Sequence, residues 1–224
     1  MSIGVVNLAI VAVARNRYDG EIYYTDRHLG RLFDYIKAQP WADRTAIILS
    51  SDHGEAFGEH GRSRHGFFLW EVLVRVPLLF YVPGVEGKTI DKARSHIDLA
   101  PTIFELMGQP RPADWQGKSL LAEIKGKETP EDRDVVVDLP RTTDNFRYRA
   151  LIHKQHKIIA RGDDWRFDVF DLEADPGETR KLNRAKPKIY KRMKQRYLDK
   201  VKTIKDVCPR IRNKLKGKHP SRPC

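Results

Sequence analysis

The spacing of apolar residues between positions 18 and 36 predicts an amphipathic helix. Side chains of apolar character recur three or four positions apart, at Tyr18, Ile22, Thr25, Leu29, Leu32, Phe33 and Ile36. They therefore share one face, which a globular protein would bury. Pro40 should end this helix. The apolar run 3–14 has no Lys or Arg before it, so we interpret it as part of a helix and not as a signal peptide.

Two short apolar runs, at 45–50 and 77–82, predict strands. Because each run is continuous rather than alternating, both strands are expected to be buried on both faces of a parallel sheet. A helix should follow at 98–108, with Asp98 as its N-cap and Gly108 as its stop. The order helix, strand, loop, strand, helix is typical of a doubly wound α/β sheet.

After residue 108 the pattern changes to short strands separated by turns. The strands are predicted at 135–138, 148–152, 157–160 and 167–171, and an Asp-Pro-Gly turn signal follows at 175–177. These strands predict a small antiparallel sheet. A helix whose apolar positions run from Ile189 to Ile204 should cover the sheet, and Pro209 should end that helix.

The net charge of +12 is concentrated at one end of the chain. Residues 186–224 hold 15 Lys and Arg against Asp199 and Asp206, so the rest of the chain is close to neutral. The two cysteines, Cys208 and Cys224, lie in this basic segment without metal-ligand spacing. A hydrophobic content of 40% allows a packed core. No apolar run reaches the ~18 residues of a membrane span.

The loop 51–66 concentrates the residues that can carry chemistry: three histidines, three acidic residues and four glycines. Ligands of open α/β sheets bind at the carboxyl ends of strands, where this loop lies. Adjacent Asp52 and His53 offer an oxygen and a nitrogen that suit a divalent cation. A lone Asp-His pair, however, is more often a cap or a surface hydrogen bond. His53 and His60 are seven positions apart, outside the His-Glu-x-x-His zinc motif, so a metal site must share ligands from elsewhere.

Several segments together resemble the C-terminal half of the sulfatase family, which belongs to the alkaline-phosphatase-like hydrolases. The matching segments are Ser-Asp-His-Gly-Glu at 51–55, Gly-Glu-His-Gly at 58–61, Arg-Val-Pro at 75–77, and stretches at 18–30, 95–102 and 170–178. The resemblance implies that residues 1–110 form the C-terminal part of the family's doubly wound α/β catalytic domain. Residues 111–207 would then form a small α+β subdomain, with an antiparallel sheet and a C-terminal helix. Residues 208–224 would be a flexible basic tail.

The resemblance also implies roles for individual residues. Asp52 and His53 match the family's second pair of metal ligands, usually for Ca²⁺ and in some members for Mn²⁺ or Zn²⁺. His65 matches the position of a Lys or His that contacts the sulfate and helps to offset charge on the leaving oxygen. His65 is therefore the expected catalytic residue of this chain.

Other interpretations of the loop stay open at this stage. His65 could merely brace the loop through a hydrogen bond. For His60, bracing the loop is the better explanation than binding a metal. The sequence assigns no role to Glu55 or Arg64.

The family's nucleophile motif, Cys or Ser-x-Pro-x-Arg, does not occur in this sequence. Cys208 is followed directly by proline, one place too early, and the segment 219–222 lacks a Cys or Ser two places before its proline. The family's first pair of metal-binding aspartates is not found either. The chain is therefore expected to be a sulfuric ester hydrolase fragment that is inactive alone. A formylglycine nucleophile is expected only in the N-terminal part that this sequence lacks.

Two other functions stay open. A phosphodiesterase or phosphonate monoester hydrolase of the same superfamily would share the Asp-His loop and differ in the nucleophile region. A non-catalytic remnant could instead bind polyanions through the basic segment. The expected partner is a sulfate ester, either a small molecule or a glycan, and no specific nucleic acid. The sequence predicts neither an oligomeric state nor a compartment.

Overall fold

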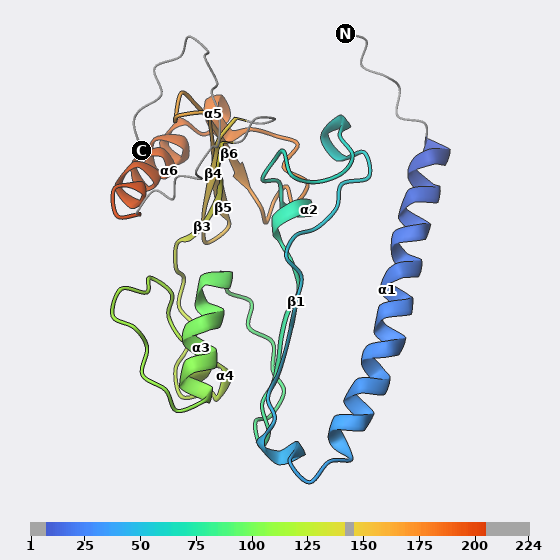
Figure 1. Cartoon of the computed structure of the whole chain (residues 1–224). Helices are drawn as coiled ribbons and strands as arrows, with labels where there is room; N and C mark the ends of the chain where they lie inside the picture. Colours follow the sequence, from blue (N-terminus) through green and yellow to red (C-terminus); the bar gives the residue numbers. More distant parts are fainter. Residues whose placement is uncertain (1–7, 142–145, 205–224) are drawn as a thin grey trace, which may run out of the picture. The chain divides into compact units, whose positions relative to one another are not determined.

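The computed structural model describes residues 8–141 and 146–204. The predicted tail at 208–224 and its two cysteines lie outside these residues, as does Pro209. The elements follow one another along the chain as expected: one long helix, a pair of strands with short helices, then a four-stranded sheet with C-terminal helices (Figure 1).

The chain divides into two compact units. Residues 1–65 and 75–131 belong to the first unit, and residues 66–74 and 132–224 belong to the second. The functional loop lies almost entirely in the first unit. The second unit contains most of the buried apolar side chains.

The first unit begins with the helix α1 (Leu8–Lys37), which confirms the predicted helix and extends it toward the N-terminus. A turn at Pro40 and the 3-10 helix η1 (Ala42–Arg44) follow. The expected burial of one helix face is wrong for this structure, because no side chain of α1 between positions 10 and 37 is buried. The apolar periodicity produces the helix, but burial needs a covering layer, which the described residues of this unit do not provide.

The strands β1 (Ile47–Ser50) and β2 (Leu78–Tyr81) form a two-stranded sheet. They pair antiparallel, with Ile47 opposite Tyr81, whereas parallel pairing was expected. Burial on both faces is also not observed, because Leu79 and Tyr81 expose 54% and 53% of their surface. Apolar β-formers determine that a strand forms, but whether its faces are covered depends on other layers of the fold.

The segment after β2 forms the 3-10 helix η3 (His96–Asp98), the helix α3 (Leu99–Leu106) and the short helix α4 (Leu121–Ile124). Gly108 adopts φ +65 and ends α3 as predicted. Asp98 occupies the predicted N-cap position of α3, but its side chain makes no cap hydrogen bond there. Ser95 is the N-cap of η3, and the buried Asp98 carboxylate accepts hydrogen bonds from the amides of Ser95 and Lys118. Asp98 therefore joins two segments instead of capping α3.

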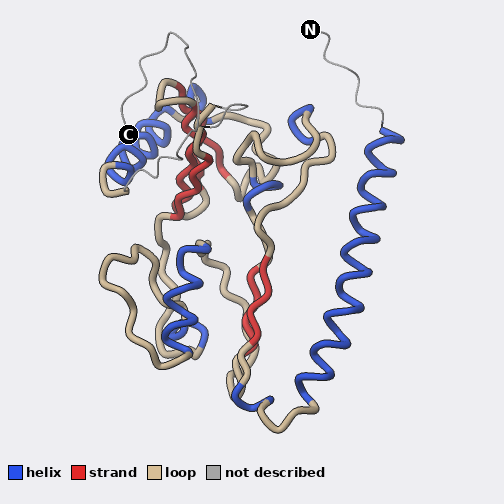
Figure 2. Tube along the Cα trace, in the orientation of Figure 1, coloured by secondary structure: helices blue, strands red, loops and turns tan. Residues whose placement is uncertain are grey.

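The second unit contains the helix α2 (Glu71–Val74) and four strands in the order β3-β4-β5-β6. The strands are β3 (Val135–Leu139), β4 (Tyr148–His153), β5 (His156–Arg161) and β6 (Arg166–Asp171). All neighbours pair antiparallel, which confirms the predicted sheet. Figure 2 shows the strands in red. The helices α5 (Leu182–Ala185) and α6 (Pro187–Val201) follow, and α6 packs against the sheet.

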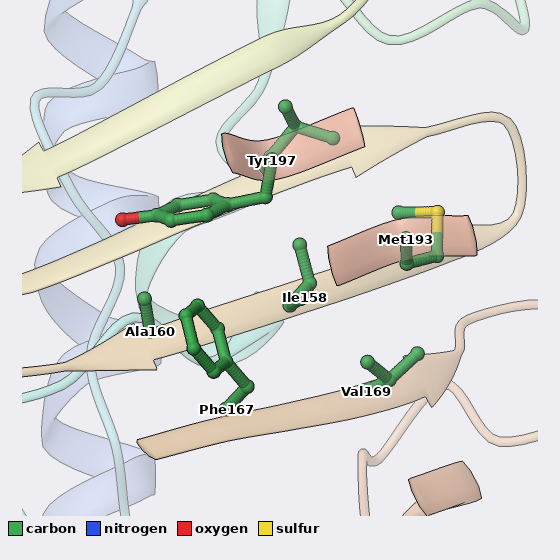
Figure 3. Close-up of a cluster of buried hydrophobic side chains, with 7 residues drawn as sticks. Ile158, Ala160, Phe167, Val169, Met193 and Tyr197 are labelled. Atoms are coloured by element: carbon green, nitrogen blue, oxygen red, sulfur yellow. The ribbon is translucent and has the colours of Figure 1, made fainter. Parts of the chain in front are cut away.

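The core of the second unit lies between this sheet and α6 (Figure 3). Its members are fully or almost fully buried: Leu151, Ile158, Ala160, Phe167, Val169, Met193 and Tyr197. Met193 and Tyr197 are four positions apart on α6, so both point toward the strands. The sheet and α6 therefore stabilise each other through apolar burial.

Candidate functional site

The candidate site begins where β1 ends. The Ser50 hydroxyl donates a hydrogen bond to the Pro77 carbonyl at 2.8 Å and lies 2.8 Å from Nε2 of His96. Because the Ser50 proton is directed to a carbonyl, Nε2 of His96 is assigned as the donor to the Ser50 oxygen. The strand end is thereby attached to both β2 and the start of η3. This attachment fixes the point from which the loop with Asp52 and His53 departs.

Asp52 and His53 lie side by side directly after this strand end. The His53 amide donates to Oδ1 of Asp52 at 2.9 Å. Nδ1 of His53 donates to the Gly54 carbonyl at 2.9 Å, so in the neutral ring Nε2 keeps its lone pair. That nitrogen lies 3.6 Å from Oδ2 of Asp52, and both side chains are exposed. One carboxylate oxygen and one bare imidazole nitrogen are thus presented together, a donor pair that fits two positions around a divalent cation.

His65 joins this pair through its ring. Its imidazole stacks on that of His53, with ring centroids 4.1 Å apart and an interplanar angle of 29°. Nδ1 of His65 lies 2.9 Å from Oε2 of Glu55, and the other oxygen of Glu55 accepts the Ala56 amide at 3.2 Å. The structure therefore brings together Asp52, His53 and His65, and adds Glu55. Sequence reasoning left Glu55 open because a spacing of ten residues within an irregular loop carries no periodic signal.

The other arm of the loop contacts α1. Arg15 donates to Oε1 of Glu59 at 2.9 Å, while Oε2 of Glu59 accepts the Phe57 amide at 2.6 Å. The ring of Phe57 packs edge-on against Tyr18 with centroids 5.2 Å apart. These contacts support the loop and were not predicted from the sequence, because 44 residues separate Arg15 from Glu59.

The turn at the tip of the loop depends on backbone conformations that favour glycine. Gly58 and Gly61 adopt φ +121 and +68, and His60 between them adopts φ +55 in the 3-10 turn η2 (Glu59–Gly61). Arg64 adopts φ +73, and its amide donates to the Ala56 carbonyl at 2.9 Å. His60 and Arg64 therefore occupy strained positions of the turn. We propose no direct role in ligand binding for His60 or Arg64.

Within residues 8–141 and 146–204, no group of three or more His, Cys, Asp and Glu side chains is arranged to hold a metal ion. Asp52 and His53 therefore offer two ligands for a metal ion, and further ligands would have to come from groups other than a described cluster of these side chains. In the same part of the chain, no helix is long and apolar enough to cross a membrane.

Comparison with known proteins identifies related sequences. Residues 9–109 match the family model described as Sulfatase. An N-acetylglucosamine-6-O-sulfatase of Bacteroides thetaiotaomicron is 30% identical over 179 residues, which cover 72% of this chain and 30% of that protein. A choline-sulfatase of Rhizobium meliloti is 31% identical over 183 residues, which cover 75% of this chain and 33% of that protein. The chain thus spans about a third of the length of these curated relatives.

Solved structures show the same fold. The structure of BT4656 in complex with its substrate D-glucosamine-2-N,6-O-disulfate gives a TM-score of 0.70 at 26% identity, covering 81% of this chain and 39% of that one. The phosphonate monoester hydrolase of Agrobacterium radiobacter gives a TM-score of 0.71 at 22% identity, covering 85% and 41%. The second similarity concerns the fold alone. The sequence and structural similarities agree with the motifs of the loop 51–66: residues 9–109 match the sulfatase family, and the chain resembles sulfatases in sequence and fold.

Proposed function

We propose that this chain acts in the hydrolysis of sulfuric esters and supplies metal-binding and sulfate-contacting residues to that reaction. The observation that carries the proposal is the cluster at the end of β1, where His53 lies against both Asp52 and His65. The match of residues 9–109 to the sulfatase family supports the choice of sulfate as the reacting group. Members of this family generally use a divalent metal.

In the proposed mechanism, Asp52 and His53 would hold the cation, through a carboxylate oxygen and through Nε2. We expect Ca²⁺, with Mn²⁺ or Zn²⁺ as alternatives. When bound, the cation would supply Lewis-acid stabilisation of charge on the sulfate oxygens. His65 contacts the sulfate through Nε2, since Nδ1 is already directed to Glu55. With Nδ1–H directed to Glu55, only the doubly protonated ring carries a proton on Nε2, and in that form Nε2–H would donate a hydrogen bond to the oxygen on which negative charge develops.

The nucleophile is the part of the reaction that this sequence does not account for. Without a Cys or Ser-x-Pro-x-Arg motif, the chain offers no precursor of formylglycine. We therefore propose that the chain alone is inactive and that the attacking group belongs to sequence outside it. Two ligands would also bind a cation only weakly.

Two measurements test this proposal. The purified chain should bind Ca²⁺ weakly in calorimetry, Asp52→Asn should abolish that binding, and neither protein should hydrolyse 4-nitrophenyl sulfate. Metal-dependent turnover by the chain, lost in Asp52→Asn, would disprove its inactivity. The nucleotide sequence upstream of Met1 tests the remainder. An in-frame Cys or Ser-x-Pro-x-Arg motif is the expected result, and a stop codon close to Met1 would contradict it.

The second candidate is a phosphodiesterase or phosphonate monoester hydrolase. It is supported by the fold similarity to the phosphonate monoester hydrolase of Agrobacterium radiobacter, because phosphoryl and sulfuryl groups have similar shape and charge. A threonine in the upstream nucleophile position would favour this candidate.

The proposed partner is a sulfate ester, either a small molecule or a glycan. The relatives include an N-acetylglucosamine-6-O-sulfatase, an ulvan-active sulfatase and a choline-sulfatase. Both polymeric and small substrates are therefore represented among proteins of similar sequence.

A further inference from the structure

The helix α6 of the second unit has one face that the sheet does not cover. Met193 and Tyr197 are buried against the strands. With 100° between successive residues, the opposite sector of the helix holds six polar side chains. These are Lys188, Lys191, Arg192, Gln195, Asp199 and Lys202.

The single acidic side chain on α6 already has partners on the same helix face. The carboxylate of Asp199 accepts hydrogen bonds from Gln195 at 3.0 Å and from Lys202 at 3.1 Å. These two hydrogen bonds hold the pKa of Asp199 below its ordinary value, so it remains ionised and keeps Lys202 engaged. Three cations of the sector, Lys188, Lys191 and Arg192, are left.

Those three cations differ from the other basic residues of the same helix. Lys188, Lys191 and Arg192 are exposed, and no carboxylate among the residues that the structure describes lies within ion-pair distance of them. In contrast, Arg196 contacts Asp134 at 2.6 Å, and the ammonium of Lys194 lies 4.8 Å from the ring centre of Phe167. The helix thus separates its basic residues into an engaged set and a free set.

The segment before α6 extends the free set. Arg184 at the end of α5 and Lys186 between the two helices are also exposed, and likewise have no carboxylate within ion-pair distance in the described chain. Five cations therefore occur within nine consecutive positions, from 184 to 192. At a helical rise of about 1.5 Å per residue, the three on α6 lie within about 6 Å along the axis. We call these five residues the basic face.

We propose that the basic face binds a sulfated polysaccharide. This inference deepens the proposed function, on which the choice of a sulfated ligand rests. Free, solvated cations can contact sulfate groups without first breaking an ion pair in the protein. Their close spacing favours a ligand with repeated negative charges over a single anion. A single-stranded nucleic acid is disfavoured, because the one aromatic residue between positions 184 and 192, Tyr190, packs against the core and is not offered for base stacking.

Heparin binding by the full chain tests the proposal, measured by calorimetry between ~50 and 200 mM salt. The test variant is Lys188→Ala/Lys191→Ala. The matched control, Lys194→Ala/Arg196→Ala, removes the same charge from the same helix. The test variant should reduce the slope of log K against log salt by about 2, since each contact contributes roughly 0.9. The control should reduce it by less than half as much.

Three outcomes would overturn the proposal: equal effects of the two variants, no heparin binding at low salt, or tighter binding to duplex DNA than to heparin at the same salt. Equal effects would show that heparin binding depends only on the net charge of the helix. Asp52→Asn should leave heparin binding unchanged. Failure of the chain to bind Ca²⁺, together with retained heparin binding, would therefore refute the proposed metal site without affecting the basic face. Ca²⁺ binding without heparin binding would refute the basic face and leave the proposed metal site standing.

Discussion

Nδ1 of His65 lies 2.9 Å from Oε2 of Glu55, while the ring of His65 stacks on His53. The carboxylate can only accept when ionised, so it fixes the proton of the neutral ring on Nδ1 and leaves Nε2 for other contacts. Glu55 is thus placed to set both the orientation and the tautomer of the proposed catalytic histidine.

Replacing Glu55 should change the tautomer of His65. In ¹⁵N-resolved spectra of the chain at about pH 8, where imidazole is neutral, the wild type should carry the His65 proton on Nδ1. Glu55→Ala should shift the population toward Nε2–H, whereas Glu55→Gln should retain Nδ1–H, because its amide oxygen still accepts. In a complete enzyme, Glu55→Ala should cost about 10- to 100-fold in activity. Identical His65 spectra in the wild type and Glu55→Ala would refute this role.

Lys157 should be the most sensitive charged residue of the second unit. Its ammonium is fully buried, 2.8 Å from Oε1 of Glu71 and 3.0 Å from Oε1 of Glu178. Lys157→Met would leave these two carboxylates together without their cation, and we expect a loss of about 3–5 kcal/mol in unfolding free energy. Urea denaturation measures this loss. The exposed Lys154→Met is the control and should change stability by less than about 0.5 kcal/mol; equal effects of both substitutions would contradict the importance of the buried cluster.

The stability of the second unit should fall on mild acidification because of His156. Burial lowers the pKa of His156 below 6.5, Arg192 and His153 act in the same direction, and Asp171 opposes them. Since the unfolded chain takes up the proton at higher pH than the folded chain, this contribution is complete above pH 6.5. It is lost as the pH falls through the folded pKa.

The corresponding experiment compares urea midpoints at about pH 7.5 and pH 5. His156→Gln should show a smaller decrease between the two pH values than the wild type. His28→Gln, at an exposed position of α1, should decrease as much as the wild type. A decrease that is unaffected by His156→Gln would assign the acid sensitivity to other groups.

A small substitution at Gly117 should destabilise the first unit. A Cβ atom at this position would lie 1.9 Å from the Ile97 carbonyl oxygen, so the chain around η3 would have to move. Gly117→Ala should therefore lower the unfolding free energy by about 1–3 kcal/mol. Gly87→Ala is the control, because nothing lies within 4 Å of its added Cβ. Similar denaturation curves for the two variants would show that the close approach is readily relieved.

Local patterns predicted most of the helices and strands of this protein and suggested a ligand pair. A period of three to four predicted α6 and the C-terminal end of α1, and short runs separated by turns predicted the four strands β3 to β6, all within a few residues of their observed ends, because such patterns reflect backbone geometry. The N-terminal end of α1, at Leu8, lies well before the predicted start at Tyr18. Asp52 and His53 could be proposed as metal ligands because they are adjacent in sequence, follow directly after a strand and match the motif of the sulfatase family.

Only the tertiary structure decided which elements meet and which side chains are covered. The pairing of β1 with β2 is antiparallel, and α1 lacks a buried face in this structure, because strand direction and burial depend on contacts between distant segments. The same holds for the supports of the site. Glu55 reaches His65 across ten residues, and Arg15 reaches Glu59 across 44. Such contacts follow from how the backbone folds in three dimensions and leave no periodic trace in the sequence.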